Sequence, residues 1–295
     1  MRTVATVADL RQALAAVRRG AGSAGPGTGE AVVGLVPTMG ALHEGHLSLA
    51  DRARALTRYV VMSIFVNPTQ FGPAEDFERY PRDLARDGEL AERRGVDLLY
   101  APTVEEVYPG GDYALEVRVV PKRLADRLCG ASRPGHFEGV LTVVAKLFGM
   151  VQPDVAVFGQ KDYQQATLIR RMAKDLDLPV RIEVAPIVRE PDGLALSSRN
   201  AYLTDAERER ATSLSLGLFS ARHAFEAEGV TDPDRLKARV RGTMRVAGVD
   251  PEYVELVDPD TLEPLAEARP GAVVAVAAWV GQTRLIDNAI LGLKA

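Results

Sequence analysis

The chain has 295 residues, of which 46% are hydrophobic and 26% are charged, as in an ordinary globular protein. Its 36 basic and 40 acidic side chains give a formal net charge of −4, which argues against a dedicated nucleic-acid-binding protein, since those carry a basic excess. The single cysteine, Cys129, excludes an internal disulfide and a multi-cysteine metal site. No run approaches the ~18 apolar residues of a membrane helix and the N-terminus lacks a signal-peptide pattern, so we expect a cytoplasmic protein.

Short apolar runs alternate with helical patterns over residues 1–188. Helices are predicted at 4–17, 45–56, 82–94, 135–150 and 163–176, and strands at 31–36, 59–66, 97–101, 155–158 and 180–187. Strands that alternate with helices of this length form βαβ units with a parallel sheet. The sequence therefore predicts a doubly wound, Rossmann-like α/β domain over residues 1–188.

The pattern changes after residue 188, where Pro191 and Gly193 favour a domain boundary. Helices are predicted at 205–228 and 233–246, and strands at 252–257, 272–279 and 283–290, the last two as a hairpin that turns near Gly281. Helices followed by antiparallel strands are typical of α+β domains. We therefore predict a smaller α+β domain over residues 189–295.

The glycine-rich segment 19–30 contains a false dinucleotide motif. Residues 20–25 match G-x-G-x-x-G by letter, but that motif binds a dinucleotide only where it follows a strand and opens a helix. Here it follows a predicted helix and leads into the first predicted strand. We interpret residues 19–30 as a surface loop that does not bind nucleotide.

The strongest functional signal is the segment 36–46, VPTMGALHEGH, which follows the first predicted strand and leads into a helix. Open α/β sheets bind ligands at this edge, and the free N–H groups of a helix start suit phosphates. His43 and His46 are three residues apart, so they can face one side and stabilise charge on a phosphate. The plain alternative is that one histidine caps the helix and the other packs. A zinc site would need a third ligand nearby.

Two further strand ends carry polar groups. Asn67 and Gln70 follow the second predicted strand, and their amides can recognise a hydroxyl or a carboxylate. After the fourth predicted strand, Lys161 is a natural partner for phosphate charge. Asp162 can hold a ribose hydroxyl or cap the next helix, and Gln165 lies three residues further on.

A fourth polar segment lies in the second predicted domain. Ser197 and Ser198 precede Arg199, a set that can clamp phosphates, although a serine turn with a solvated arginine explains it equally well. We interpret His136 and His223 as structural. The four segments together predict a cleft for a nucleoside triphosphate and a small polar substrate.

Five segments together resemble the pantoate–β-alanine ligase family: VPTMGALHEGH, FVNPTQF, RPGHFEGV, FGQKDYQQ and LSSRN. The resemblance extends from about residue 31 to the C-terminus. It implies the condensation of pantoate with β-alanine in coenzyme A biosynthesis, with ATP as a substrate, Mg²⁺ as the metal, and a pantoyl adenylate as the intermediate. It also implies a cytoplasmic homodimer joined through its N-terminal domain.

The same resemblance implies roles for individual residues. The catalytic set would be His43, His46, Lys161 and Arg199, with His46 as the family's proton donor. Gln70 would hold pantoate and β-alanine, and Gln165 would hold pantoate. The ATP-binding residues would be Met39, Gly40, Ala41, Leu42, His43, Glu44, Gly45, His46, Gly159, Gln160, Lys161, Asp162, Val188, Leu196, Ser197, Ser198 and Arg199. A wall for the methyl groups of pantoate, or simply part of the core, would be Val140, Val143 and Val144.

The residues themselves leave three other functions open. Another small-molecule nucleotidyltransferase would share the H-x-G-H segment, but would need a more basic acceptor pocket near Gln70. A non-catalytic nucleotide-binding or scaffold protein would not require four such groups around one cleft, namely His43, His46, Lys161 and Arg199. Transfer RNA aminoacylation would need a basic anticodon-binding region, whereas the chain after Val188 is mixed in charge.

Overall fold

The computed structural model describes residues 1–20, 32–73, 75–110 and 115–292. The chain divides into two compact units. The first comprises Met1–Lys122, Arg133–Gly159 and Leu168–Ala185, and the second comprises Arg123–Ser132, Gln160–Thr167 and Pro186–Ala295. Each unit has its own sheet and its own hydrophobic core. The domain boundary expected at residue 188 stays a prediction.

The first unit is built on a six-stranded parallel sheet with the strand order β1-β4-β3-β2-β5-β6. The strands are β1 (Arg2–Val4), β2 (Val33–Thr38), β3 (Tyr59–Ile64), β4 (Leu98–Tyr100), β5 (Val155–Gly159) and β6 (Arg181–Ala185). The helices are α1 (Val7–Gly20), α2 (Glu44–Leu56), α3 (Leu84–Arg93), α4 (Val104–Val107), α6 (His136–Val151) and α7 (Tyr163–Asp175), the last of which begins in the second unit.

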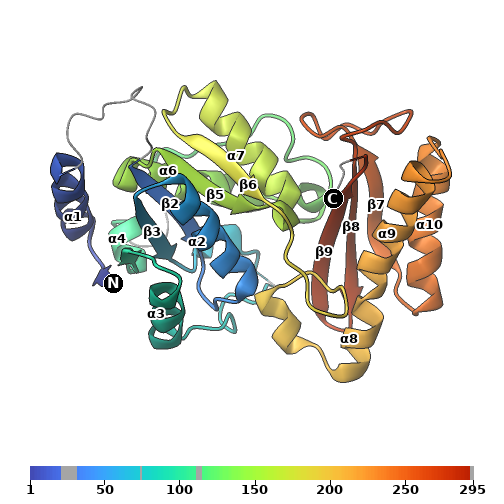
Figure 1. Cartoon of the computed structure of the whole chain (residues 1–295), viewed down its shortest axis with the longest axis horizontal. Helices are drawn as coiled ribbons and strands as arrows, with labels where there is room; N and C mark the ends of the chain where they lie inside the picture. The colour runs from blue at the N-terminus through green and yellow to red at the C-terminus, as the bar shows by residue number, and fades with distance from the viewer. Residues whose placement is uncertain (21–31, 74, 111–114, 293–295) are drawn as a thin grey trace. The chain divides into compact units, whose positions relative to one another are not determined.

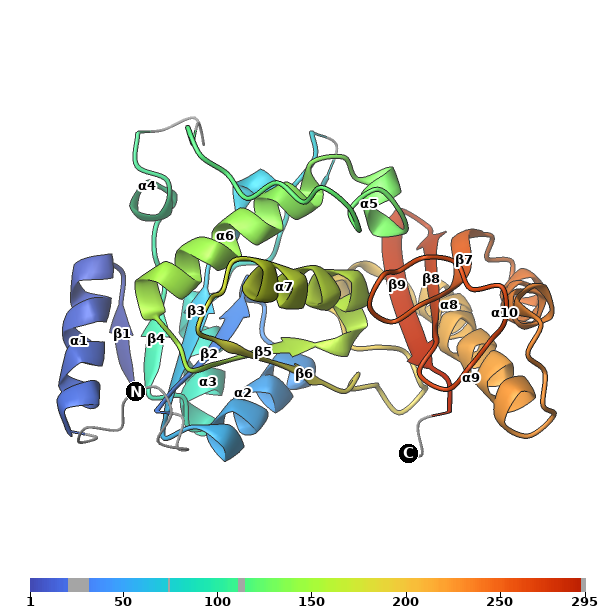
Figure 2. The same ribbon diagram turned by 90° about the horizontal axis from the view of Figure 1, so that it is seen from above.

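Helices cover both faces of this sheet, which confirms the predicted doubly wound fold. Figure 2 shows α2 and α3 on one face, and α6 with the later part of α7 on the other. The central strand β2 accordingly buries Val33, Leu35 and Val36 completely, because a parallel sheet covered on both sides needs apolar residues on both faces.

The strand order places a topological switch point beside β2. From β2 the chain proceeds to β3 and then β4 in one direction, whereas β5 pairs with the opposite edge of β2. In open α/β sheets, ligands bind outside the carboxyl ends of the strands at such a point. The segments that leave β2 and β5, which begin at Met39 and Gln160, are therefore the expected ligand-binding segments.

The N-terminal prediction was wrong at its first residues. Arg2–Val4 form β1, which pairs with β4, and the helix begins at Val7 rather than at residue 4. A three-residue edge strand is too short to show a period of two, and its last residue, Val4, fits the apolar pattern of the helix that follows. The helix also includes Arg19 and Gly20, which were predicted as loop, and the remainder of that loop lies outside the described residues.

The second unit contains a three-stranded antiparallel sheet with helices, as predicted. Its strands are β7 (Pro251–Val257), β8 (Val273–Val280) and β9 (Thr283–Ile290), and its helices are α5 (Cys129–Ser132), α8 (Asp205–Ala211), α9 (Ser213–Glu226) and α10 (Pro233–Val246). Figure 1 shows α9 and α10 side by side against this sheet. The hairpin between β8 and β9 turns at Gly281, whose φ of 59° favours glycine.

The helix predicted at 205–228 is divided between α8 and α9. The interruption is confined to Thr212, which keeps a helical backbone with φ of −60° and ψ of −22°. The hydroxyls of Thr212 and Ser213 donate to the carbonyls of Glu209 and Arg210, a bonding pattern that bends helices. In the described ranges, no helix is long and apolar enough to cross a membrane.

Candidate active site

The loop after β2 has a strained backbone that brings it close to its neighbours. Gly40 has a φ of 82° and Ala41 a φ of 50°, both in the left-handed region. A Cβ atom at Gly40 would lie 2.9 Å from Oδ2 of Asp87 and 3.0 Å from a methyl of Ile64. Glycine is therefore required at position 40 both by its φ and by the space available.

Asp87 on α3 holds this loop in place. Its side chain accepts hydrogen bonds from the N–H groups of Ala41 and Leu42, both at 2.8 Å, and the residue is only 1% exposed. A buried carboxylate is stable only when its oxygens are satisfied, and two backbone donors provide this. Sequence reasoning missed Asp87, because an acidic residue in a highly charged helix gives no local sign that it is buried.

His43 and His46 lie side by side at the start of α2. Their ring centroids are 4.1 Å apart, with 33° between the ring planes. His43 is the N-cap residue, and its Nδ1 accepts a hydrogen bond from the N–H of Gly45 at 3.1 Å. The capping alternative is thus correct for His43. Because Nδ1 is the acceptor, Nε2 carries the proton of a neutral ring and can donate to a ligand.

Gln70 ends the short 3₁₀ helix η1 (Pro68–Gln70) that follows β3. Its amide nitrogen lies 2.9 Å from Sδ of Met39, so the structure brings two predicted site segments together. Asn67 is 1% exposed and donates to Oε1 of Gln70 at 3.1 Å and to the carbonyl of Gly139 at 3.2 Å. The Oδ1 of Asn67 accepts from Tyr108 at 2.7 Å. Asn67 therefore positions Gln70.

Burial raises the pKa of Tyr108 above its ordinary value, and the hydrogen bond with Thr69 and the charge of Arg118 only partly oppose this. The phenol therefore stays protonated at neutral pH and donates to the buried amide of Asn67. The carbonyl of Gly139 can only accept, so the amide nitrogen of Asn67 must face it and the amide oxygen faces the phenol.

The backbone of Gln70 is held by residues from the start of α6 and the loop before it. The Nδ1 of His136 lies 2.8 Å from the carbonyl oxygen of Gln70, and Arg133 donates to the same oxygen at 3.3 Å. Arg133 also pairs with both carboxylate oxygens of Glu75, at 2.8 and 2.6 Å. At Gly139 on α6, a Cβ atom would lie 2.2 Å from the carbonyl of Thr69.

Burial raises the pKa of Glu75, but the hydrogen bonds and positive charge of Arg133 outweigh it, so the pKa lies below its ordinary value. Glu75 is thus ionised at neutral pH and compensates the guanidinium charge. The histidine at 136 acts as a structural residue in this network, as its sequence context suggested. Three buried valines of α6 were also singled out there, namely Val140, Val143 and Val144, and burial fits both a core role and an apolar wall.

In the second unit, the 3₁₀ turn η2 (Gln160–Asp162) follows β5 directly and precedes α7. The Nζ atom of Lys161 lies 3.8 Å from Oδ2 of Asp162. Gln165 lies in the first turn of α7 and is partly exposed, whereas its neighbour Gln164 is buried and donates to the carbonyls of Leu124 and Arg127. Gln164 is therefore a structural residue.

The predicted clamp begins in a hairpin-like loop of the same unit. Leu196 donates its N–H to the carbonyl of Val188 at 3.0 Å, so the structure brings these two predicted ATP contacts together. Ser197 caps the 3₁₀ helix η3 (Ser198–Tyr202), and its Oγ accepts from the N–H of Arg199 at 3.3 Å. Ser197 therefore forms the serine turn of the plain alternative, and a clamp role stays a prediction. That the segments of the two units share one cleft stays a prediction.

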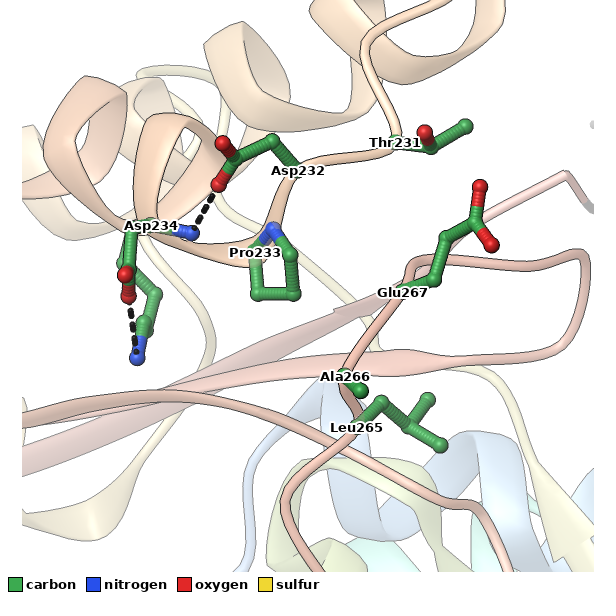
Figure 3. A pocket seen from close by; sticks show the side chains of 8 residues that line it. Thr231, Asp232, Pro233, Asp234, Leu265, Ala266 and Glu267 are labelled. Atoms are coloured by element: carbon green, nitrogen blue, oxygen red, sulfur yellow. Dashed lines mark hydrogen bonds and ion pairs between the residues drawn. The ribbon is translucent and has the colours of Figure 1, made fainter.

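A separate surface pocket lies between the start of α10 and the loop before β8, with a volume of about 480 Å³. Figure 3 shows the carboxylate of Asp232 turned back onto the N–H of Asp234, as an N-cap. None of the predicted site residues lines it. Its acidic residues, Asp232, Asp234 and Glu267, suit neither a nucleotide nor a carboxylate substrate.

The described residues hold no group of three or more histidine, cysteine, aspartate or glutamate side chains suited to a metal ion. The described side chains therefore do not form a metal site built from protein ligands alone.

The fold and the site define an α/β protein with a phosphate-suited loop and paired histidines at the switch point of its sheet. The family model for pantoate–β-alanine ligase matches residues 2–290. Pantothenate synthetase 1 of Bradyrhizobium diazoefficiens is 53% identical over 294 residues, covering 99% of this chain and 98% of that protein. The pantothenate synthetase of Moorella thermoacetica is 53% identical over 296 residues, covering 99% of each.

Solved structures agree. The pantothenate synthetase of Thermus thermophilus superimposes with a TM-score of 0.89 at 48% identity, over 98% of this chain and 99% of that one. The pantoate–β-alanine ligase of Francisella tularensis, in its complex with beta-gamma ATP and β-alanine, gives a TM-score of 0.79 at 33% identity, over 98% of this chain and 97% of that one. The chain belongs to the pantoate–β-alanine ligase family, and it is a ligase, as the resemblance predicted.

Proposed function

We propose that this ligase uses ATP to activate the carboxylate of pantoate as pantoyl adenylate and then transfers the pantoyl group to the amine of β-alanine. The first step forms the acyl phosphate bond and releases pyrophosphate. The second forms an amide and releases AMP. The observation that carries the proposal is the loop from Met39 to His46, which Asp87 fixes, which carries two paired imidazoles, and whose Met39 contacts Gln70.

The first step needs charge stabilisation more than a protein nucleophile, because the attacking group is the carboxylate of the substrate. As the α-phosphorus is attacked, negative charge grows on its oxygens and on the departing pyrophosphate. The Nε2–H of His43 and the N–H groups at the start of α2 are donors suited to that charge. We assign His46 to the same task, ahead of a proton-transfer role.

The remaining predicted residues divide between the phosphates and the organic substrates. Lys161 would neutralise phosphate charge, and Arg199 would close over the triphosphate with Ser197 and Ser198. The amide of Gln70, oriented by Asn67, would bind pantoate and later the incoming β-alanine. An amide suits this role, since it recognises hydroxyl and carboxylate groups without adding charge that must be neutralised when the product leaves. The other predicted contacts are Gly159, Gln160, Asp162, Gln165, Val188 and Leu196 for ATP or pantoate.

Mg²⁺ would enter bound to the phosphates of ATP, and when bound it would supply further charge neutralisation. We further propose a cytoplasmic homodimer joined through its N-terminal domain, a proposal that rests on the family resemblance.

Pantoate-dependent exchange of labelled pyrophosphate into ATP, measured without β-alanine, tests the proposal. Exchange that requires pantoate would support a reversible adenylation step. Exchange without pantoate, or none from folded protein that binds ATP, would contradict it and favour another acceptor. Gln70→Ala should raise the pantoate concentration needed for half-maximal exchange more than the ATP concentration, and the reverse result would refute the substrate assignment.

A further inference from the structure

Asn288 on β9 holds the turn that carries Lys161. Its Nδ2 donates to the carbonyls of both Gln160 and Lys161, each at 3.0 Å, and its Oδ1 accepts from Nε2 of Gln160 at 3.1 Å. Asn288 is 2% exposed, so these bonds lie away from water. The orientation of its amide is determined, because the flipped amide would face two carbonyl oxygens with a third oxygen.

The turn η2 depends on such support. It is a single 3₁₀ turn of three residues, and such turns have poorer hydrogen-bond geometry than α-helices and little stability of their own. Two of its carbonyl groups find their partner in one side chain that is 127 residues or more away in the sequence. Removing that side chain would leave both carbonyls without this donor and free the turn to move.

Asn288 itself is well anchored. Its own N–H donates to Oδ1 of the preceding residue, Asp287, at 2.7 Å. Asp287 in turn receives two hydrogen bonds from the guanidinium of Arg189, at 2.7 and 3.0 Å. Arg189 directly follows Val188, a predicted ATP contact, so adjacent residues of β9 support two predicted nucleotide-binding segments.

We propose that Asn288 is a positioning residue, which fixes the backbone of Gln160 and Lys161 so that the ammonium group of Lys161 is placed for the triphosphate. The inference rests on the proposed role of Lys161 in phosphate binding. A lysine carries its charge on a flexible stem, so its effect on a transition state depends on how firmly the backbone beneath it is held.

A double-mutant cycle between Asn288→Ala and Lys161→Ala tests this, with pantoate-dependent pyrophosphate exchange as the readout. We expect Asn288→Ala to lower exchange about 10- to 100-fold, the range that a small misplacement can cause. If Asn288 acts through Lys161, adding Asn288→Ala to Lys161→Ala should lower exchange by no more than about threefold further, because the group being positioned is already gone. If the double variant instead loses exchange by the product of the two single-variant factors, the inference is overturned.

Two additional measurements separate positioning from a general structural effect. Asn288→Ala should raise the KM for ATP and leave the KM for β-alanine unchanged. Ser215→Ala removes another buried hydrogen bond of the same unit, from Oγ to the carbonyl of Thr212 at 2.9 Å, and should leave exchange unchanged. An equal effect of the two alanine variants on exchange would overturn the inference.

Stability and the proposed function are controlled separately. Urea unfolding of each variant checks that it is folded, and if Asn288→Ala is not, the milder Asn288→Ser, which keeps one hydroxyl donor, takes its place in the cycle. Normal exchange in Lys161→Ala would refute the proposed role of Lys161, and with it the basis of the inference. Reduced exchange in Lys161→Ala with normal exchange in a folded Asn288 variant would refute the inference alone.

Discussion

Replacing Asp87 by asparagine should damage both the stability of the protein and its first half-reaction. The carboxylate accepts two backbone hydrogen bonds at 2.8 Å in a site that is 1% exposed. An asparagine keeps one acceptor but turns an NH₂ group toward the second N–H. Losing one bond to a charged group costs about 1.5–3 kcal/mol, and weakening the other from charged to neutral costs about 1 kcal/mol more. We therefore expect the free energy of unfolding to fall by about 2.5–4 kcal/mol.

A domain with an ordinary stability of about 5–15 kcal/mol would remain folded, so the effect on activity can be measured. Displacement of the loop from Met39 to His46 should lower pyrophosphate exchange about 100-fold. Urea unfolding and exchange are measured together, with Glu89→Gln as the matched control. Glu89 lies on the same helix, is 71% exposed and faces Arg93 at 3.5 Å, so its variant removes the same charge without touching the loop. Equal, small effects of the two variants would refute the reasoning.

Three further predictions concern residues of the first unit, namely His46, Gly139 and Glu75. His46→Ala should lower pyrophosphate exchange at least about 100-fold, as loss of a charge-stabilising donor does. His223→Ala, at an exposed site in α9, should leave exchange unchanged. Equal exchange rates in the two variants would refute the role of His46. Gly139→Ala should destabilise the protein, because the new Cβ would lie 2.2 Å from the backbone of η1. Gly149→Ala on the same helix meets nothing within 4 Å and should stabilise the protein by about 0.5–1 kcal/mol. If urea unfolding ranks the two variants in the opposite order, the close approach at Gly139 is contradicted. The pKa of Glu75 in the folded protein lies below its ordinary value of 4.5, so the ion pair with Arg133 stabilises the fold fully above pH 4.5 and this stability is lost as the pH falls through the folded pKa. Glu75→Gln should therefore flatten the decline of the free energy of unfolding in acid. An unchanged slope would argue against the pair.

The sequence predicted the sheet and the main helices well because each strong element carries a local period. Buried strands such as β2 and β5 read as continuous apolar runs, and α6 shows apolar residues at helical spacing. What failed was short or depended on distant partners. The strand β1 has three residues, and its pairing with β4 spans almost a hundred positions, so nothing local could indicate it.

The same distinction applies to the candidate site. Residues that we predict to face a ligand, such as His43, Gln70 and Lys161, follow strand ends in recognisable segments. The residues that hold those segments in place do not, because a buried polar side chain is selected by backbone groups on other elements. Asp87 meets N–H groups 46 and 45 residues away, and Asn288 meets carbonyl groups 128 and 127 residues away.

This division has a consequence for how activity can be lost. The supporting residues are not among the predicted ligand contacts, yet each satisfies two backbone groups in a loop or turn whose side chains we predict to face a ligand. Their substitution should therefore change affinity and rate through geometry, and the change should disappear once the supported residue is itself removed. A residue that acted only by stabilising the fold would lack this dependence. The cycle between Asn288 and Lys161 measures that dependence directly, and a parallel cycle between Asp87 and His43 would show whether the two units follow the same rule.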